Sequence, residues 1–102
     1  MAEYRLHYVP QSGNCYKVAL MLELTGTPWE PRFWDMFAGA TRTPEFLALN
    51  GMGELPVLEH GGEVLTQSAL ILSYLIKQTG QFGGKTDAER REVMRCLVWD
   101  NH

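Results

Sequence analysis

The sequence has few cysteines and no concentrated positive charge. Its two cysteines, Cys15 and Cys96, lie far apart and form no CxxC pair, which argues against a disulfide scaffold or a zinc site and indicates reduced thiols. Nine Lys plus Arg stand against twelve Asp plus Glu, for a formal net charge of −3, and no basic block could neutralise a phosphate backbone. We therefore expect no metal and no nucleic-acid partner.

Long apolar runs are also missing. The N-terminus reads Met-Ala-Glu-Tyr-Arg, with charges where a signal peptide needs an apolar core, and no stretch of about 18 apolar residues occurs. These features predict a soluble, cytoplasmic protein without a membrane partner. The 102 residues, 45% hydrophobic and 21% charged, suit one compact globular domain.

Strand and helix patterns alternate in the first part of the chain. Residues 4–9 alternate polar with apolar or aromatic side chains and stop at Pro10, which predicts a strand. Residues 14–24 are rich in helix formers and end before Gly26, a typical C-terminal signal. Residues 32–34 are aromatic enough for a short second strand, which a nearby proline places at a sheet edge.

The next part continues the alternation. A Thr-Pro pair at the start of residues 43–49 predicts a short capped helix. Residues 56–60 and 63–66, joined by a Gly-Gly turn, predict a β-hairpin. Residues 68–79 carry an apolar face and predict an amphipathic helix. The order β-α-β-α-β-β-α predicts an α/β fold of the thioredoxin-like type, with a mixed four-stranded sheet.

A further helix begins after the Gly-rich linker 81–85. Thr86 and Glu89 form a capping box, and the apolar face of this helix consists of Val93, Met94, Leu97 and Val98. This face predicts a missing partner, so we expect residues 1–80 to form one domain and residues 86–102 to begin an incomplete all-α domain. The alternative is that this trailing amphipathic helix folds back on its own domain.

Candidate chemistry lies first where the initial strand leads into a helix. Helix N–H groups and the helix dipole favour negative charge there, so the Ser12 hydroxyl could donate to a bound thiolate. Without a CxxC pair, a dithiol cycle is not available. The structural alternative is that Ser12 or Asn14 only caps the helix and that Cys15 is a buried small hydrophobe.

Two later segments offer contacts for an extended anionic ligand. A cis peptide bond between Leu55 and Pro56 would expose the backbone of Leu55 for pairing with a peptide, although an ordinary trans bond is the commoner case. Ser68 is a candidate N-cap at a helix start suited to a carboxylate, with the Gln67 amide beside it. Arg42 could bind another carboxylate or simply be solvated.

Taken together, these residues resemble the glutathione S-transferase family over residues 4–80. The resemblance lies in four ordered segments: residues 12–18, 43–50, 53–58 and 67–71. It implies that glutathione is a co-substrate and that Ser12 matches the hydroxyl activating its sulfur in Ser-type branches. Cys15 matches a position that is catalytic in some Cys-type branches. We choose Ser12.

The resemblance also assigns the other site residues. Pro56 matches the family's cis-proline, and Leu55 matches the residue whose backbone pairs with the cysteinyl part of glutathione. Gln67 and Ser68 match the pair that holds the γ-glutamyl group, and Arg42 is a weaker match for a residue on the glycyl carboxylate. Glu54 departs from the basic or amide residue common in the family, which predicts weaker glutathione binding.

The implied activity is conjugation of glutathione to an electrophile, a detoxification reaction. In the family an all-helical second domain supplies most of the electrophile pocket and much of the contact of a homodimer, and residues 86–102 resemble its first helix. Two alternatives stay open. One is a non-catalytic glutathione-binding or protein-interaction module, and the other is a glutathione-dependent thiol oxidoreductase that uses Cys15 and needs this thiol exposed.

Overall fold

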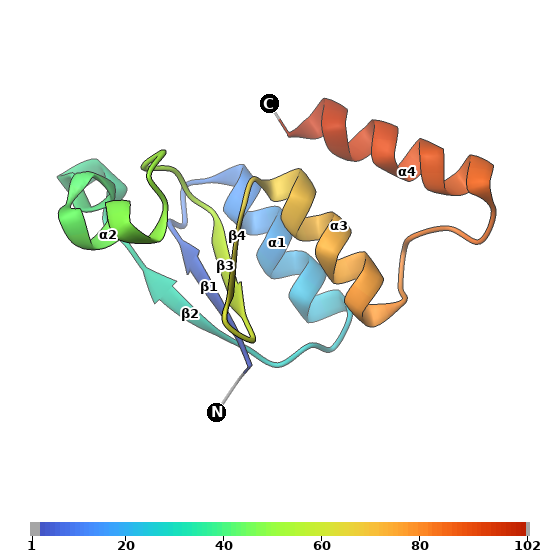
Figure 1. The fold of residues 1–102 in the computed structure, drawn as a ribbon, viewed down its shortest axis with the longest axis horizontal. Coiled ribbons are helices and arrows are strands. Elements are labelled where there is room, and N and C mark those ends of the chain that lie inside the picture. The colour runs from blue at the N-terminus through green and yellow to red at the C-terminus, as the bar shows by residue number, and fades with distance from the viewer. Residues whose placement is uncertain (1–2, 102) are drawn as a thin grey trace.

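A four-stranded β-sheet lies at the centre of the computed structural model, which describes residues 3–101 (Figure 1). In space the strands are ordered β2-β1-β3-β4; β1 pairs in parallel with β2, and β3 is antiparallel to both of its neighbours. In chain order the elements are β1 (Tyr4–Tyr8), α1 (Gly13–Leu24), β2 (Trp29–Phe33), the 3-10 turns η1 (Met36–Ala38) and η2 (Ala40–Arg42), α2 (Pro44–Leu49), β3 (Val57–His60), β4 (Glu63–Thr66), α3 (Ser68–Thr79) and α4 (Asp87–Asp100). This is the mixed thioredoxin-like sheet that the sequence predicts.

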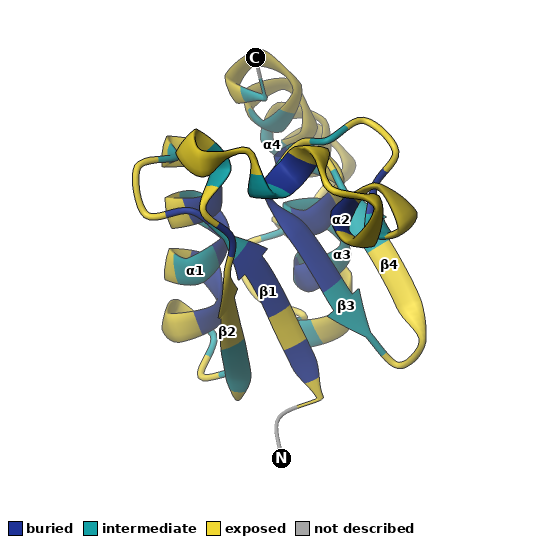
Figure 2. Ribbon diagram, turned by 90° about the vertical axis from the view of Figure 1, so that its left-hand side faces the viewer, coloured by how far each residue is buried: buried dark blue, intermediate teal, exposed yellow. Residues whose placement is uncertain are grey.

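Helices cover both faces of the sheet, so the molecule has two apolar clusters. α1 and α3 lie on one face, and α2 lies with the two 3-10 turns on the other (Figure 1). Adjacent residues of β3 contribute to different clusters, because successive side chains along a strand point to opposite faces of the sheet. Leu58 joins the cluster under α1 and α3, whereas Val57 packs with Trp34 and Phe46 beneath α2. The central strands β1 and β3 are the more buried ones (Figure 2).

The second strand differs from its predicted bounds. It spans Trp29–Phe33 rather than residues 32–34, and Trp34 leaves the strand to become a core residue that is 7% exposed. Pairing with β1 sets this register, with Pro31 opposite Leu6. An edge strand pairs on one side, so it tolerates a residue that has no N–H.

The last helix, α4, runs back alongside α3 after the linker (Figure 1). Thr86 is its N-cap, and Glu89 completes the predicted capping box. Val93 and Leu97 are partly buried. The other two residues of the apolar face, Met94 and Val98, are exposed, and so is the adjacent Trp99. No helix within residues 3–101 is long and apolar enough to cross a membrane.

Candidate functional site

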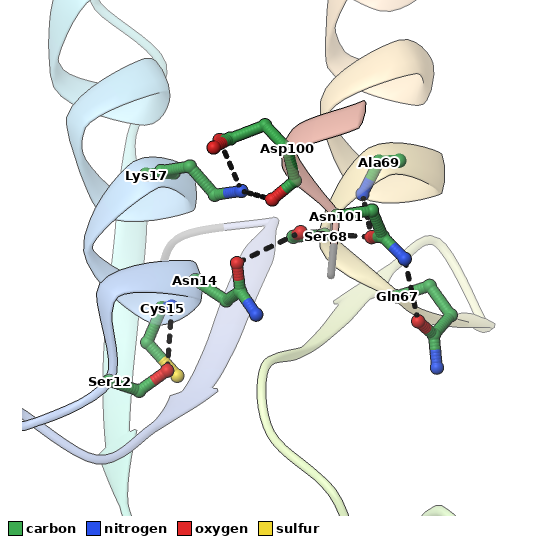
Figure 3. A network of polar contacts seen from close by, with 9 residues as sticks. All are labelled: Ser12, Asn14, Cys15, Lys17, Gln67, Ser68, Ala69, Asp100 and Asn101. Carbon is green, nitrogen blue, oxygen red and sulfur yellow. Dashed lines mark hydrogen bonds and ion pairs between the residues drawn. The ribbon is translucent and has the colours of Figure 1, made fainter. Parts of the chain in front are cut away.

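Ser12 ends the loop after β1 and is the N-cap residue of α1. Its N–H donates to Val9 O at 3.1 Å, which turns the chain from the strand into the helix. Its Oγ accepts the N–H of Cys15 at 3.2 Å (Figure 3). This bond uses an oxygen lone pair and leaves the hydroxyl proton available to a ligand. Capping the helix and donating to an anion are therefore compatible roles for Ser12.

Cys15 lies in the first turn of the same helix, and its side chain is buried. Cys15 is 2% exposed, whereas Cys96 on α4 is exposed. A thiol that attacks a substrate must be reachable. The oxidoreductase alternative requires an exposed Cys15, and this arrangement does not provide one.

The loop between α2 and β3 is held by its own polar contacts. Asn50 is buried; its Nδ2 donates to Glu54 O at 2.9 Å and its Oδ1 accepts the N–H of Met52 at 3.1 Å. Gly53 has φ 68°, and a Cβ there would lie 3.2 Å from a backbone oxygen, so glycine is required. The peptide bond from Leu55 to Pro56 at the end of this loop is cis.

The start of α3 differs from the expected capping. Ser68 is the first residue of the helix rather than its N-cap, a position held by Gln67 with φ 73° and no side-chain cap bond of its own. The cap comes from Asn101, whose Oδ1 accepts the N–H of Ala69 at 2.8 Å and lies 3.0 Å from Ser68 Oγ (Figure 3). The sequence did not reveal this, because a residue 32 positions away supplies the oxygen.

These segments enclose a cavity of about 520 Å³ between the α2–β3 loop and the start of α3. It brings together the five predicted residues Arg42, Leu55, Pro56, Gln67 and Ser68, and its other lining residues are Asn14, Met36, Thr41, Asn50, Gly53, Glu54 and Asn101. Ser12 and Cys15 do not line it. Ser12 lies instead in a second depression of about 350 Å³, and Asn14 lines both.

Arg42 and Glu54 are the charged residues that line the cavity. Glu54 Oε1 lies 3.5 Å from Gln67 Nε2, so its carboxylate faces the start of α3. The first N–H groups of a helix have no partner within the helix and carry its positive dipole end, and here Asn101 Oδ1 accepts one of them, that of Ala69. The cavity thus places a guanidinium, at Arg42, and a helix start, at Ser68, in the same lining as the carboxylate of Glu54.

The fold defines a thioredoxin-like domain with a polar cavity at the start of α3, and comparisons with known proteins give its family. Residues 11–78 match the family model of the N-terminal domain of glutathione S-transferase. Glutathione S-transferase 3 of Zea mays is 37% identical over 99 residues, covering 97% of this chain and 45% of that protein.

Solved structures agree. A possible glutathione S-transferase from Rhodopseudomonas palustris matches with a TM-score of 0.91 and 36% identity, over 99% of this chain and 50% of that one. The theta-class enzyme from Xanthomonas axonopodis pv. citri, solved with glutathione bound, matches at 0.89 and 28% identity, over 97% of this chain and 48% of that one. The chain therefore belongs to the glutathione S-transferase family and spans about half the length of these relatives.

Proposed function

We propose that this chain is the glutathione-binding part of a glutathione transferase. The observation that carries the proposal is the cavity, which gathers Arg42, Leu55, Pro56, Gln67 and Ser68 from three separate segments. Glutathione is an extended tripeptide with a carboxylate at each end. The cavity combines the Arg42 guanidinium, the start of α3 at Ser68 and the loop backbone of Leu55 before β3, and these groups complement the two carboxylates and the peptide backbone of glutathione.

In this proposal the γ-glutamyl carboxylate binds at the start of α3, with donors from Ser68 and Gln67. The cysteinyl part pairs with the backbone of Leu55, next to the cis bond to Pro56. Arg42 takes the glycyl carboxylate through its planar fork of donors. The depression at Ser12 lies beside the cavity and shares Asn14 with it, which suits a sulfur held between the two.

Ser12 then stabilises the thiolate of bound glutathione by donating its hydroxyl proton to the sulfur. A hydrogen bond to the charged form lowers the pKa of the thiol and raises the fraction of thiolate at neutral pH. The thiolate attacks the electrophile and forms a C–S bond, while a leaving group departs or the product takes up a proton. Ser12 is partly exposed whereas Cys15 is buried, which supports Ser12 as the residue that reaches the sulfur.

The remaining features of the whole protein belong to the same proposal. We expect a cytoplasmic homodimer that detoxifies small electrophiles and takes its second substrate in an all-helical domain starting at Thr86. Exposed apolar residues on α4 support such a domain, because apolar side chains gathered on a surface are typical of a site that another part of the protein covers: Met94, Val98 and Trp99.

The Ser12→Ala variant tests the mechanism. We expect the pKa of the bound glutathione thiol to rise by about one to two pH units, because a hydrogen bond to a charged group contributes about 1.5–3 kcal/mol. Affinity for glutathione should change little, since the carboxylate contacts remain. Ultraviolet absorbance of the thiolate, titrated against pH in the complex, measures the shift.

Cys15→Ala is the matched variant in the same turn. It removes the thiol while keeping Ser12 and its cap, so thiolate formation on bound glutathione should persist. An unchanged thiol pKa in Ser12→Ala would remove Ser12 from the mechanism. Loss of all activity in Cys15→Ala, with the fold intact by circular dichroism, would favour the oxidoreductase alternative.

A further inference from the structure

The C-terminal end of α4 reaches the proposed glutathione site from outside residues 1–80. Asn101 follows α4 and contacts three consecutive residues at the start of α3: Gln67, Ser68 and Ala69 (Figure 3). The same end of α4 is anchored on α1, where Lys17 Nζ binds the carboxylate of Asp100 at 2.7 Å. Asn101 is therefore held at the start of α3 by its own contacts and by the neighbouring ion pair to α1, and it lines the cavity itself.

The chemistry of these contacts fixes the orientation of two amides. The N–H of Ala69 can only donate, so the Asn101 atom 2.8 Å from it must be the oxygen Oδ1. Asn101 Nδ2 then points to Gln67 and donates to its Oε1 at 3.1 Å. This bond requires Gln67 to present its oxygen to Asn101, which directs its Nε2 the other way, toward Glu54 on the cavity wall.

We propose that Asn101 is a positioning residue that turns the N–H₂ group of Gln67 into the cavity for the ligand's α-carboxylate. The inference rests on the proposed glutathione function. Without Asn101, a Gln67 amide can present either its oxygen or its nitrogen to the ligand, and the oxygen repels a carboxylate. Through Asn101, residues 86–101 then contribute to the glutathione-binding cavity as well as beginning the proposed helical domain.

The test compares two ligands by isothermal titration calorimetry on the full chain. One is glutathione, and the other is 4-aminobutanoyl-cysteinyl-glycine, which lacks the γ-glutamyl α-carboxylate. We expect Asn101→Ala to weaken glutathione binding about tenfold and to change binding of the second ligand less than about twofold. Trp99→Ala, at an exposed position near the same helix end, is the control and should leave both affinities unchanged.

A double-mutant cycle shows whether Asn101 acts through Gln67. In a Gln67→Ala background, Asn101→Ala should change the glutathione Kd by less than about twofold, because the side chain it orients is gone. Asn101→Asp should retain or raise thermal stability, since a carboxylate caps the start of α3 well, yet it should weaken glutathione binding. Its second oxygen repels Gln67 Oε1 and draws Nε2 away from the ligand.

Three results overturn the positioning role: equal glutathione affinity in wild type and Asn101→Ala, tighter binding by Asn101→Ala, or an undiminished effect in the Gln67→Ala background. Tighter binding would show that Asn101 competes with the ligand. If the wild-type chain binds glutathione and the variants bind it equally well, the positioning role is refuted but the proposed function stands. A folded wild-type chain that does not bind glutathione refutes the proposed function and this inference with it.

Discussion

His7 is a titratable residue of β1 that is only 4% exposed. Trp34 Nε1–H donates to its Nδ1 at 2.9 Å, and its Nε2 contacts the carboxylate of Glu59. An indole N–H is only a donor, so neutral His7 carries its hydrogen on Nε2 and donates it to Glu59. Burial lowers the pKa of His7 below its ordinary value and outweighs the opposing effect of Glu59.

We expect the free energy of unfolding to decrease as the pH falls below about 6.5, the pKa of an unperturbed histidine. The unfolded chain binds the proton first because folded His7 has the lower pKa, so stability is lost until the pH reaches that folded value. The contribution of one group approaches about 1.4 kcal/mol per pH unit. Urea denaturation of wild type and His7→Gln between about pH 5 and pH 7.5 measures it, and parallel profiles for the two proteins would contradict this role.

At the scale of elements, the start of α4 is held by local capping contacts. Glu89 Oε1 accepts the N–H groups of Lys85 and Thr86, and these backbone hydrogen bonds lower the pKa of Glu89. Thr86 Oγ1 in turn accepts the N–H of Glu89 at 3.1 Å. Because α4 contributes no residue to either core cluster, its stability rests strongly on such local bonds.

Thr86→Ala should therefore loosen α4 selectively. Loss of an N-cap side chain costs about 1 kcal/mol, which should increase amide hydrogen exchange in α4 about fivefold and leave the sheet unaffected. Thr86→Ser keeps the hydroxyl and is the matched control. If exchange rises equally in both variants, or rises equally in β1 and β3, the cap is not what holds this helix.

The sequence predicts elements well where local signals decide them. Residues 68–79 form the expected helix because the apolar period and the following Gly80, with φ 69°, both act within the element. The strand Trp29–Phe33 was misplaced because its register depends on pairing with β1, a partner some 25 residues away. Trp34 was assigned to the strand for its aromatic ring, but burial under α2 decided its position.

In the candidate site, too, local motifs could be recognised from the sequence and long-range contacts could not. The resemblance identified five residues that line the cavity, and four of them, all except Arg42, lie within the short motifs that carry it. Asn101 and Asn14 were not recognised as lining residues, because an asparagine near a helix end is typical of any cap or turn. Recognising Asn101 requires knowing that α4 returns to the start of α3, which the sequence of the linker does not specify.

At the scale of the whole molecule, the core is complete without α4. Every residue of the two apolar clusters, including the partly buried side chains packed against them, lies between Tyr4 and Ile76. α4 adds the partly buried Val93 and Leu97, the cap from Asn101, and an ion pair from Asp100 whose side chain is 55% exposed. A partly exposed ion pair of this kind stabilises little.

We therefore expect the chain ending at Lys85 to fold on its own. It should unfold cooperatively in urea, with a free energy of unfolding lower by about 1–3 kcal/mol for the lost cap and apolar contacts. Its glutathione affinity should fall about tenfold, as in Asn101→Ala, because both changes release Gln67. Urea denaturation monitored by circular dichroism measures the stability of the truncated chain, and calorimetry with glutathione measures its affinity. A truncated chain without a cooperative transition would show that α4 belongs to the folding unit, and unchanged affinity in a folded truncated chain would place glutathione recognition wholly within residues 1–85.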